Sequence, residues 1–292
     1  MFFLPVMVLY EGRELYSLDR VYQLQKNSTT TLYGVTYNGE SSIPYKRLLI
    51  RKEKPEVILV GTSLMLQWRK ELFKKNISFI NASVPGPQIG NIANAKYFID
   101  ELPNDGKKRV MMIALDHTFF TQYHPKEQNI EESSLLKKIL HIPGINIRLI
   151  YRDQGEYLFS LRALKEDSRS REGIGYSAML YGNGYRIDGS MLDTVATSNI
   201  ERHNAVRNSQ IEKKVKEFQE IANPNSFIRD DSKIINANLK SLHELLTLAK
   251  KRHITVIGFV PPSPSKVQKE MYATSTLFGL KNIQLQSDIK TI

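Results

Sequence analysis

Short apolar runs recur along the chain, and each ends in a polar or glycine-rich turn followed by a segment of helical spacing. The runs that predict strands are 56–60, 77–81, 109–115 and 253–260, with a weaker fifth at 281–286. Segments of helical spacing cover 64–75, 89–102 and 232–252. Continuous apolar runs that alternate with helices are typical of a parallel sheet with both faces covered. The sequence therefore predicts an α/β fold: a three-layer sandwich with a doubly wound, mainly parallel, flavodoxin-like sheet of about five strands.

The pattern also predicts how the chain is divided. Residues 1–54 are expected to form an N-terminal segment, and residues 55–292 the α/β domain. A large helical and irregular insertion, at about 119–230, is expected after the third strand. The first ten residues, MFFLPVMVLY, are too few to span a bilayer. Two interpretations of this run stay open: the end of a membrane anchor, or the start of a buried strand or helix.

Composition excludes several classes of function. The chain has no cysteine, which excludes disulfides, thiolate zinc sites and a cysteine nucleophile. It also lacks H-E-x-x-H and a phosphate-binding glycine motif after the first strand, so neither a metal nor a cofactor is predicted. The 41 Lys and Arg residues exceed the 30 Asp and Glu residues, giving a net charge of +11. Because the basic residues are scattered in short groups, attraction to an anionic envelope polymer is favoured over nucleic-acid binding.

Polar residues that could perform chemistry follow three of the predicted strands. They are Gly61-Thr62-Ser63 after the first, a turn leading to Gly86 after the second, and Asp116-His117 after the third. The carboxyl ends of parallel strands meet at one edge of the sheet, where α/β proteins place their ligands. A serine at such a position is suited to nucleophilic attack, with nearby backbone N–H groups to stabilise an oxyanion. The alternative for Ser63 is the role of helix N-cap.

The VILVGTS segment, the glycine-bearing second turn and VMMIALDH together resemble the SGNH (GDSL-like) hydrolase superfamily. Within it, the order of these segments is most similar to the envelope branch of alginate O-acetyltransferase-like and D-alanyl-transfer-like proteins. The resemblance covers about residues 55–120 and 232–286. It implies that Ser63 is the nucleophile, that Gly86 supplies an oxyanion donor, and that Gly61 and Thr62 line the site.

The chain departs from the family's pattern in two places. Asp116 stands where the family has an asparagine, and a carboxylate cannot donate to an oxyanion unless it is protonated. Asp116 is expected either to orient His117 or to cap the strand end. The chain also has no D-x-x-H, the motif that supplies the base near the C-terminus in the family. Near the end of this chain, Thr291 stands three residues after Asp288, where the motif would have a histidine.

The missing D-x-x-H predicts a catalytically incomplete chain that hydrolyses p-nitrophenyl acetate no faster than a Ser63→Ala variant. His117 is the one histidine directly after the carboxyl end of a predicted strand. Turnover that depends on Ser63 would therefore assign the base to His117 or to a histidine of the insertion.

The expected function is that of an SGNH-like serine esterase or O-acyltransferase of the cell envelope, acting outside the cytoplasm. Its expected partners are an acylated envelope polysaccharide or a small ester, together with a membrane if the N-terminal run is an anchor. No nucleic-acid partner is expected. The alternative is a catalytically inactive binding or assembly protein of the envelope on the same fold.

Overall fold

The computed structural model describes residues 10–34, 42–73, 76–84, 88–115, 134, 173–194, 212–213, 215–216, 232–259 and 261. The chain forms two compact units, each built from separate stretches of sequence. Unit 1 contains Met1–Lys54, Gln67–Ala82 and Gln128–Thr194. Unit 2 contains Pro55–Leu66, Ser83–Glu127 and Val195–Ile292. The change of unit at residues 54–55 coincides with the expected boundary, but unit 1 also takes in two later stretches.

Unit 1 begins with two helices whose ends follow local rules. Helix α2 (Leu18–Asn27) has Ser17 as its N-cap, and it buries Leu18, Val21, Tyr22 and Gln25 at the spacing of one helical face. Helix α3 (Ile43–Glu53) has a proline in its first turn and ends at Lys54, whose N–H donates to the Ile50 carbonyl.

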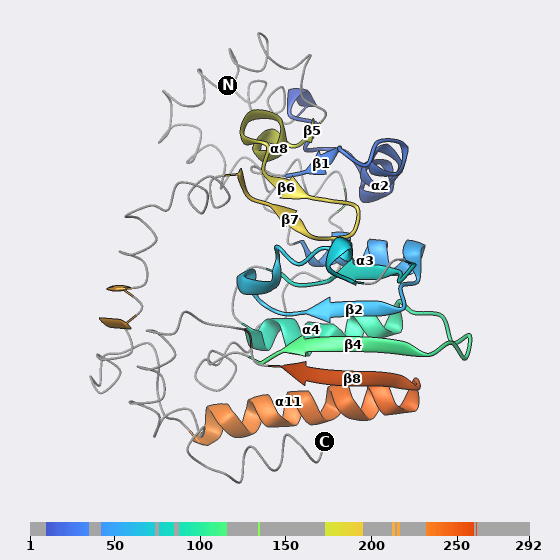
Figure 1. The fold of residues 1–292 in the computed structure, drawn as a ribbon, viewed down its shortest axis with the longest axis vertical. Helices are drawn as coiled ribbons and strands as arrows, with labels where there is room; N and C mark the ends of the chain where they lie inside the picture. The colour runs from blue at the N-terminus through green and yellow to red at the C-terminus, as the bar shows by residue number, and fades with distance from the viewer. Residues whose placement is uncertain are drawn as a thin grey trace. The chain divides into compact units, whose positions relative to one another are not determined.

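A small mixed sheet completes the described secondary structure that is confined to unit 1. Its strands, in the order β5-β1-β6-β7, are β5 (Gly173–Ile174), β1 (Leu32–Tyr33), β6 (Gly184–Tyr185) and β7 (Met191–Leu192). Strand β1 is parallel to β5 and antiparallel to β6. A short helix, α8 (Tyr176–Tyr181), follows β5 (Figure 1). Part of the expected insertion, residues 173–194, therefore pairs with the N-terminal segment.

The second sheet has the strand order β3-β2-β4-β8. These strands are β3 (Phe79–Asn81), β2 (Val57–Val60), β4 (Arg109–Ala114) and β8 (Ile254–Phe259). Strands β2, β4 and β8 are parallel: Val57 pairs with Val110, and Arg109 pairs with Ile254. Their arrows point the same way in Figure 1. The predicted mixed α/β character and parallel sheet are confirmed. The weak fifth strand at 281–286 lies outside the described residues.

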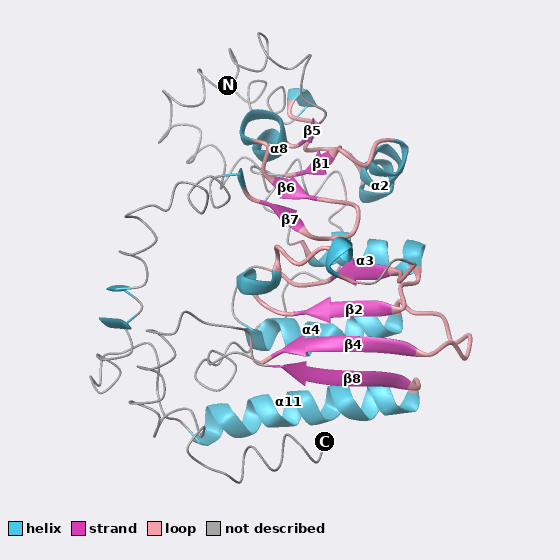
Figure 2. Cartoon of the chain, viewed as in Figure 1, coloured by secondary structure: helices cyan, strands magenta, loops and turns pink. Residues whose placement is uncertain are grey.

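Two helices of unit 2 pack against each other and against this sheet. Helix α4 (Gln88–Asp100) contacts β2, and helix α11 (Ser232–Lys251) contacts both α4 and β8 (Figure 2). Leu242, Leu245 and Ala249 of α11 are buried at helical spacing. None of the described helices is long and apolar enough to cross a membrane.

The helix predicted at 64–75 was wrong. Two short 3-10 helices stand in that stretch, η1 (Ser63–Met65) and η2 (Lys70–Leu72). The Trp68 carbonyl, between these two helices, accepts from the Asn81 amide, and the N–H of Lys70, the first residue of η2, donates to the Asp188 carboxylate. These long-range bonds engage backbone groups that an α-helix would pair along its own axis, so the helical spacing is overridden.

Candidate functional site

Ser63 lies just beyond the carboxyl end of β2, as the first residue of η1, and its side chain is exposed. The N-cap of η1 is Thr62, whose hydroxyl accepts from the Leu64 N–H at 3.5 Å. The alternative role of Ser63 as N-cap is therefore wrong. Ser63 stands at the start of a short helix, where helical geometry provides no carbonyl for its N–H group. The hydroxyl of Ser63 is thus free of a capping role and has its own backbone N–H beside it.

Gly61 lets the turn after β2 pack tightly. A Cβ added at Gly61 would lie 2.6 Å from Cγ of Met65 and 3.0 Å from Cβ of Ala114. The first distance is shorter than real Cβ contacts and the second is unusually tight, so only glycine fits here without rearrangement. The Gly61 carbonyl also accepts from the Val84 N–H at 3.2 Å. The absence of a side chain at residue 61 therefore holds the Ser63 turn against the end of β4.

The segments that follow the strands of unit 2 meet at one edge of the sheet. Leu115, directly after β4, donates its N–H to the carbonyl of Phe259 at the end of β8, at 2.8 Å. Since β2 pairs with β4, Ser63 and the segment that continues beyond Leu115 leave neighbouring strands at the same edge. Asp116, His117 and Gly86 lie outside the described residues, so their predicted roles stay predictions.

Neither of the two histidines among the described residues directly follows the carboxyl end of a strand. His253 immediately precedes β8, at the amino end of the parallel strands. A six-residue strand spans about 20 Å, so His253 is at the wrong end of the sheet to act as base for Ser63. His243 is exposed in the middle of α11.

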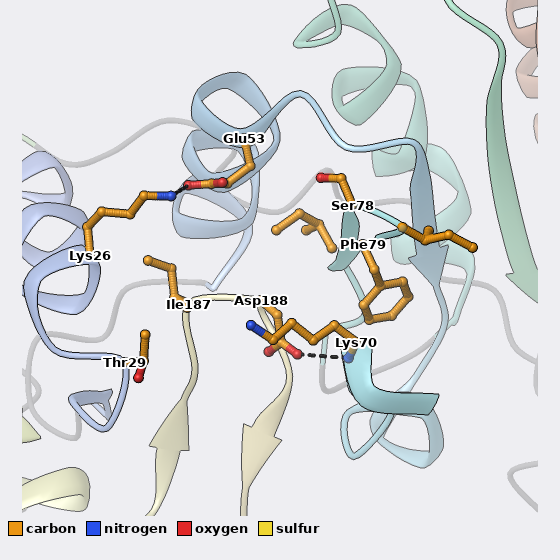
Figure 3. A pocket seen from close by; sticks show the side chains of 10 residues that line it. Lys26, Thr29, Glu53, Lys70, Ser78, Phe79, Ile187 and Asp188 are labelled. Atoms are coloured by element: carbon orange, nitrogen blue, oxygen red, sulfur yellow. Dashed lines mark hydrogen bonds and ion pairs between the residues drawn. The ribbon is translucent and has the colours of Figure 1, made fainter. Parts of the chain in front are cut away.

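A separate pocket, of about 320 Å³, lies within unit 1 (Figure 3). Its charged lining residues are Lys26, Glu53, Lys70 and Asp188. Its apolar lining residues are Ile77, Phe79, Ile80 and Ile187. In the view of Figure 3, the Lys26–Glu53 pair and the Lys70–Asp188 pair are on different sides. The pocket thus combines apolar surface with two pairs of opposite charges.

Both carboxylates of the pocket are held by hydrogen bonds. Oε1 of Glu53 accepts from the Tyr22 hydroxyl at 2.6 Å and from Nζ of Lys26 at 2.7 Å. Burial opposes ionisation of Glu53, but these two bonds lower its pKa below the ordinary value. Asp188 accepts at Oδ1 from the N–H and the hydroxyl of Ser190, and at Oδ2 from the Lys70 N–H. Both carboxyl groups are therefore fixed in place by their hydrogen bonds.

Lys46 is a fully buried lysine beneath the 186–190 turn. Its Nζ donates to the Asn81 carbonyl at 2.9 Å and to the Gly189 carbonyl, and it lies 4.2 Å from the centre of the Tyr185 ring. Burial lowers the pKa of Lys46 to about 7, against the raising effect of the Asp188 charge. Two carbonyls and an aromatic face match the three N–H groups of an ammonium.

The sequence analysis missed this pocket and Lys46. The available signal for Lys46 was its place on the apolar stripe of α3, three residues after Ile43 and before Leu49 and Ile50. No comparable signal marks the pocket, because its lining comes from residues 26–29, 53, 70–80 and 187–188. Among the described residues, no group of three or more His, Asp or Glu side chains is placed to hold a metal ion.

Comparison with known proteins gives no family. No protein-family model matches the chain, and no curated protein or solved structure is significantly similar to it.

Proposed function

We propose that this chain is an SGNH-like serine esterase or O-acyltransferase that acts on acyl esters of an envelope polysaccharide, outside the cytoplasm. In this proposal the parallel sheet belongs to a flavodoxin-like, three-layer sandwich. The observation that carries it is the exposed Ser63 hydroxyl at the carboxyl end of β2, held in a turn that only glycine at residue 61 permits.

The strand order supports this placement. Along the chain, β2 is followed by β3 on one side of it and by β4 on the other. The order in which the chain adds strands to the sheet therefore reverses between β2 and β4. Ligands of open α/β sheets bind outside the carboxyl ends of the strands at such a reversal. Ser63 follows β2, and Asp116-His117 follow β4 in sequence, so both proposed catalytic segments leave the sheet at the reversal.

The proposed chemistry is acyl transfer through a covalent serine ester. Oγ of Ser63 attacks the ester carbonyl while His117 accepts its proton, and the sugar alkoxide leaves with that proton. The N–H group of Ser63, with a donor near Gly86, stabilises the oxyanion. Water or a second hydroxyl then takes the acyl group from Ser63. Asp116 orients His117 in this scheme.

Fluorophosphonate labelling of the full chain tests the nucleophile. We expect a label on Ser63 that is absent from Ser63→Ala and unchanged in Ser78→Ala, a matched control at another exposed serine. Ser63-dependent hydrolysis of p-nitrophenyl acetate that falls roughly 1,000-fold or more in His117→Gln would assign the base. Label that persists in Ser63→Ala would remove Ser63 from the mechanism.

The second candidate function is a catalytically inactive binding or assembly protein of the envelope. It is favoured by the position of His253, which precedes β8 at the amino end of the parallel strands, opposite the Ser63 edge. An unlabelled wild-type chain, with turnover equal to that of Ser63→Ala, would support this candidate. That turnover is also the result that the missing D-x-x-H predicts.

A further inference from the structure

The pocket of unit 1 is lined by one ammonium that has no hydrogen bond or ion pair with a described residue. Glu53 is paired with Lys26 and accepts from Tyr22 as well. Asp188 accepts three hydrogen bonds, and its charge also acts on the buried Lys46. The lining thus has two lysines and two carboxylates, and both carboxylates already accept hydrogen bonds.

Lys70 is the cation with spare capacity. Its backbone N–H is bonded to Asp188, whereas its ammonium forms no hydrogen bond or ion pair with any residue in the described part of the chain. The residue is exposed and lines the pocket, so its ammonium is accessible to a ligand. In the view of Figure 3, the Lys26 ammonium lies beside Glu53, on a different side of the pocket from Lys70.

The rest of the lining is suited to a short hydrocarbon. Ile77, the most exposed of the apolar lining residues, has 37% of its surface accessible, and Ile187 and the more deeply buried Phe79 and Ile80 continue the apolar surface. Apolar walls with a few fixed polar groups are the usual composition of small-molecule sites, and about 320 Å³ is within their size range.

We infer that this pocket binds a small organic carboxylate that carries a short apolar chain. The carboxylate is held by the Lys70 ammonium, with Lys26 on the other side, and the chain packs against Ile77 and Ile187. A cationic ligand is disfavoured, since Glu53 and Asp188 already have their partners. This inference is independent of the proposed function, because it involves neither Ser63 nor unit 2.

Ligand-observed NMR and calorimetry on the full chain test the inference with hexanoate, hexan-1-ol and hexylammonium as probes of equal chain length. We expect hexanoate to bind with a dissociation constant on the order of 1 mM, as its size allows. The alcohol and the ammonium should bind at least about 10-fold more weakly. Acetate, which has no hydrocarbon to pack on Ile77, should also bind at least about 10-fold more weakly.

Matched lysine variants locate the site. Lys70→Met keeps the backbone N–H that Asp188 needs and should weaken hexanoate about 10-fold. Lys52→Met removes an equal charge from α3 at a residue that is paired with Asp19 and does not line the pocket, so it should leave binding unchanged. Equal binding of hexanoate and hexan-1-ol, or equal loss in both variants, would overturn the inference.

Discussion

At the residue scale, a single missing side chain controls the candidate nucleophile. Gly61 has an ordinary backbone conformation, so its role is close approach and not a positive φ angle. The space that its Cβ would need is occupied by Met65 and Ala114. Ala114 has no side-chain freedom with which to move away, and the clash must therefore displace the turn that holds Ser63.

We predict that Gly61→Ala lowers the free energy of unfolding by about 1–3 kcal/mol, because it overpacks a buried turn. Denaturant unfolding followed by circular dichroism measures the change. Gly258→Ala is the matched control, since its Cβ would meet only the flexible end of Leu115, at 3.2 Å. A smaller loss in Gly61→Ala than in Gly258→Ala would contradict the packing argument.

At the element scale, helix α4 contains a buried polar side chain among buried apolar residues. Asn94 is 1% exposed, and neither its Oδ1 nor its Nδ2 has a hydrogen-bond partner within the described structure. Its helical neighbours Ala95, Phe98 and Ile99 are all fully buried. A buried amide without partners costs stability, since it has lost its hydrogen bonds to water.

We predict that Asn94→Leu raises the free energy of unfolding by about 1–2 kcal/mol, because leucine has the same number of side-chain heavy atoms and no polar atoms to satisfy. Thermal unfolding by calorimetry measures the change as an increase in Tm. Asn94→Ala serves as the control: it removes the same amide but leaves a cavity, and should gain less or lose stability. A lower Tm in Asn94→Leu would mean that the amide has a ligand or water partner.

At the scale of the whole chain, unit 1 is assembled from three stretches of sequence. The buried Lys46 belongs to the first stretch and forms a hydrogen bond with one residue in each of the other two stretches. It donates from α3 to Asn81, at the end of β3, and to Gly189. Gly189 has a φ angle of 77°, and a Cβ there would lie 2.3 Å from the Asn81 carbonyl oxygen. Glycine at 189 and lysine at 46 together allow this junction.

Lys46 should make the stability of the fold depend on pH. Burial lowers its folded-state pKa to about 7, whereas an unfolded lysine titrates near its ordinary value of 10.5. Between these values the unfolded chain binds the extra proton, so the free energy of unfolding rises with pH, by up to about 1.4 kcal/mol per pH unit. Below pH 7 both states are protonated, and the full cost of burying the charge remains.

Urea unfolding at several pH values between 7.5 and 9.5 measures this slope. Burial raises the pKa of Tyr45 and Tyr185, which keeps the titration of these two folded-state phenols above the range. Lys46→Met should remove the slope while also losing stability, because two buried carbonyls lose their donor. Lys52→Met, an exposed control on the same helix, should retain it. An unchanged slope in Lys46→Met would assign the pH dependence to other groups.

The sequence by itself determined the parallel strands of unit 2 and the helices that cover them. Strands β2, β4 and β8 are continuous apolar runs, and α11 has apolar residues at a regular helical spacing. These patterns are local: each run of a few residues carries its own signal, even though β2 and β4 are mostly buried and β8 is largely exposed. The position of Ser63 after the first of these strands was determined in the same way.

Only the tertiary structure decided the turns after β2 and the whole of the unit 1 pocket. The stretch 64–75 has helical spacing, yet bonds from Asn81 and to Asp188 fix it as two short 3-10 helices. Lys70 and Asp188 are 118 residues apart, and Lys46 and Gly189 are 143 apart. No local pattern encodes which distant carbonyl will meet a given donor, because that pairing depends on how the separate stretches pack.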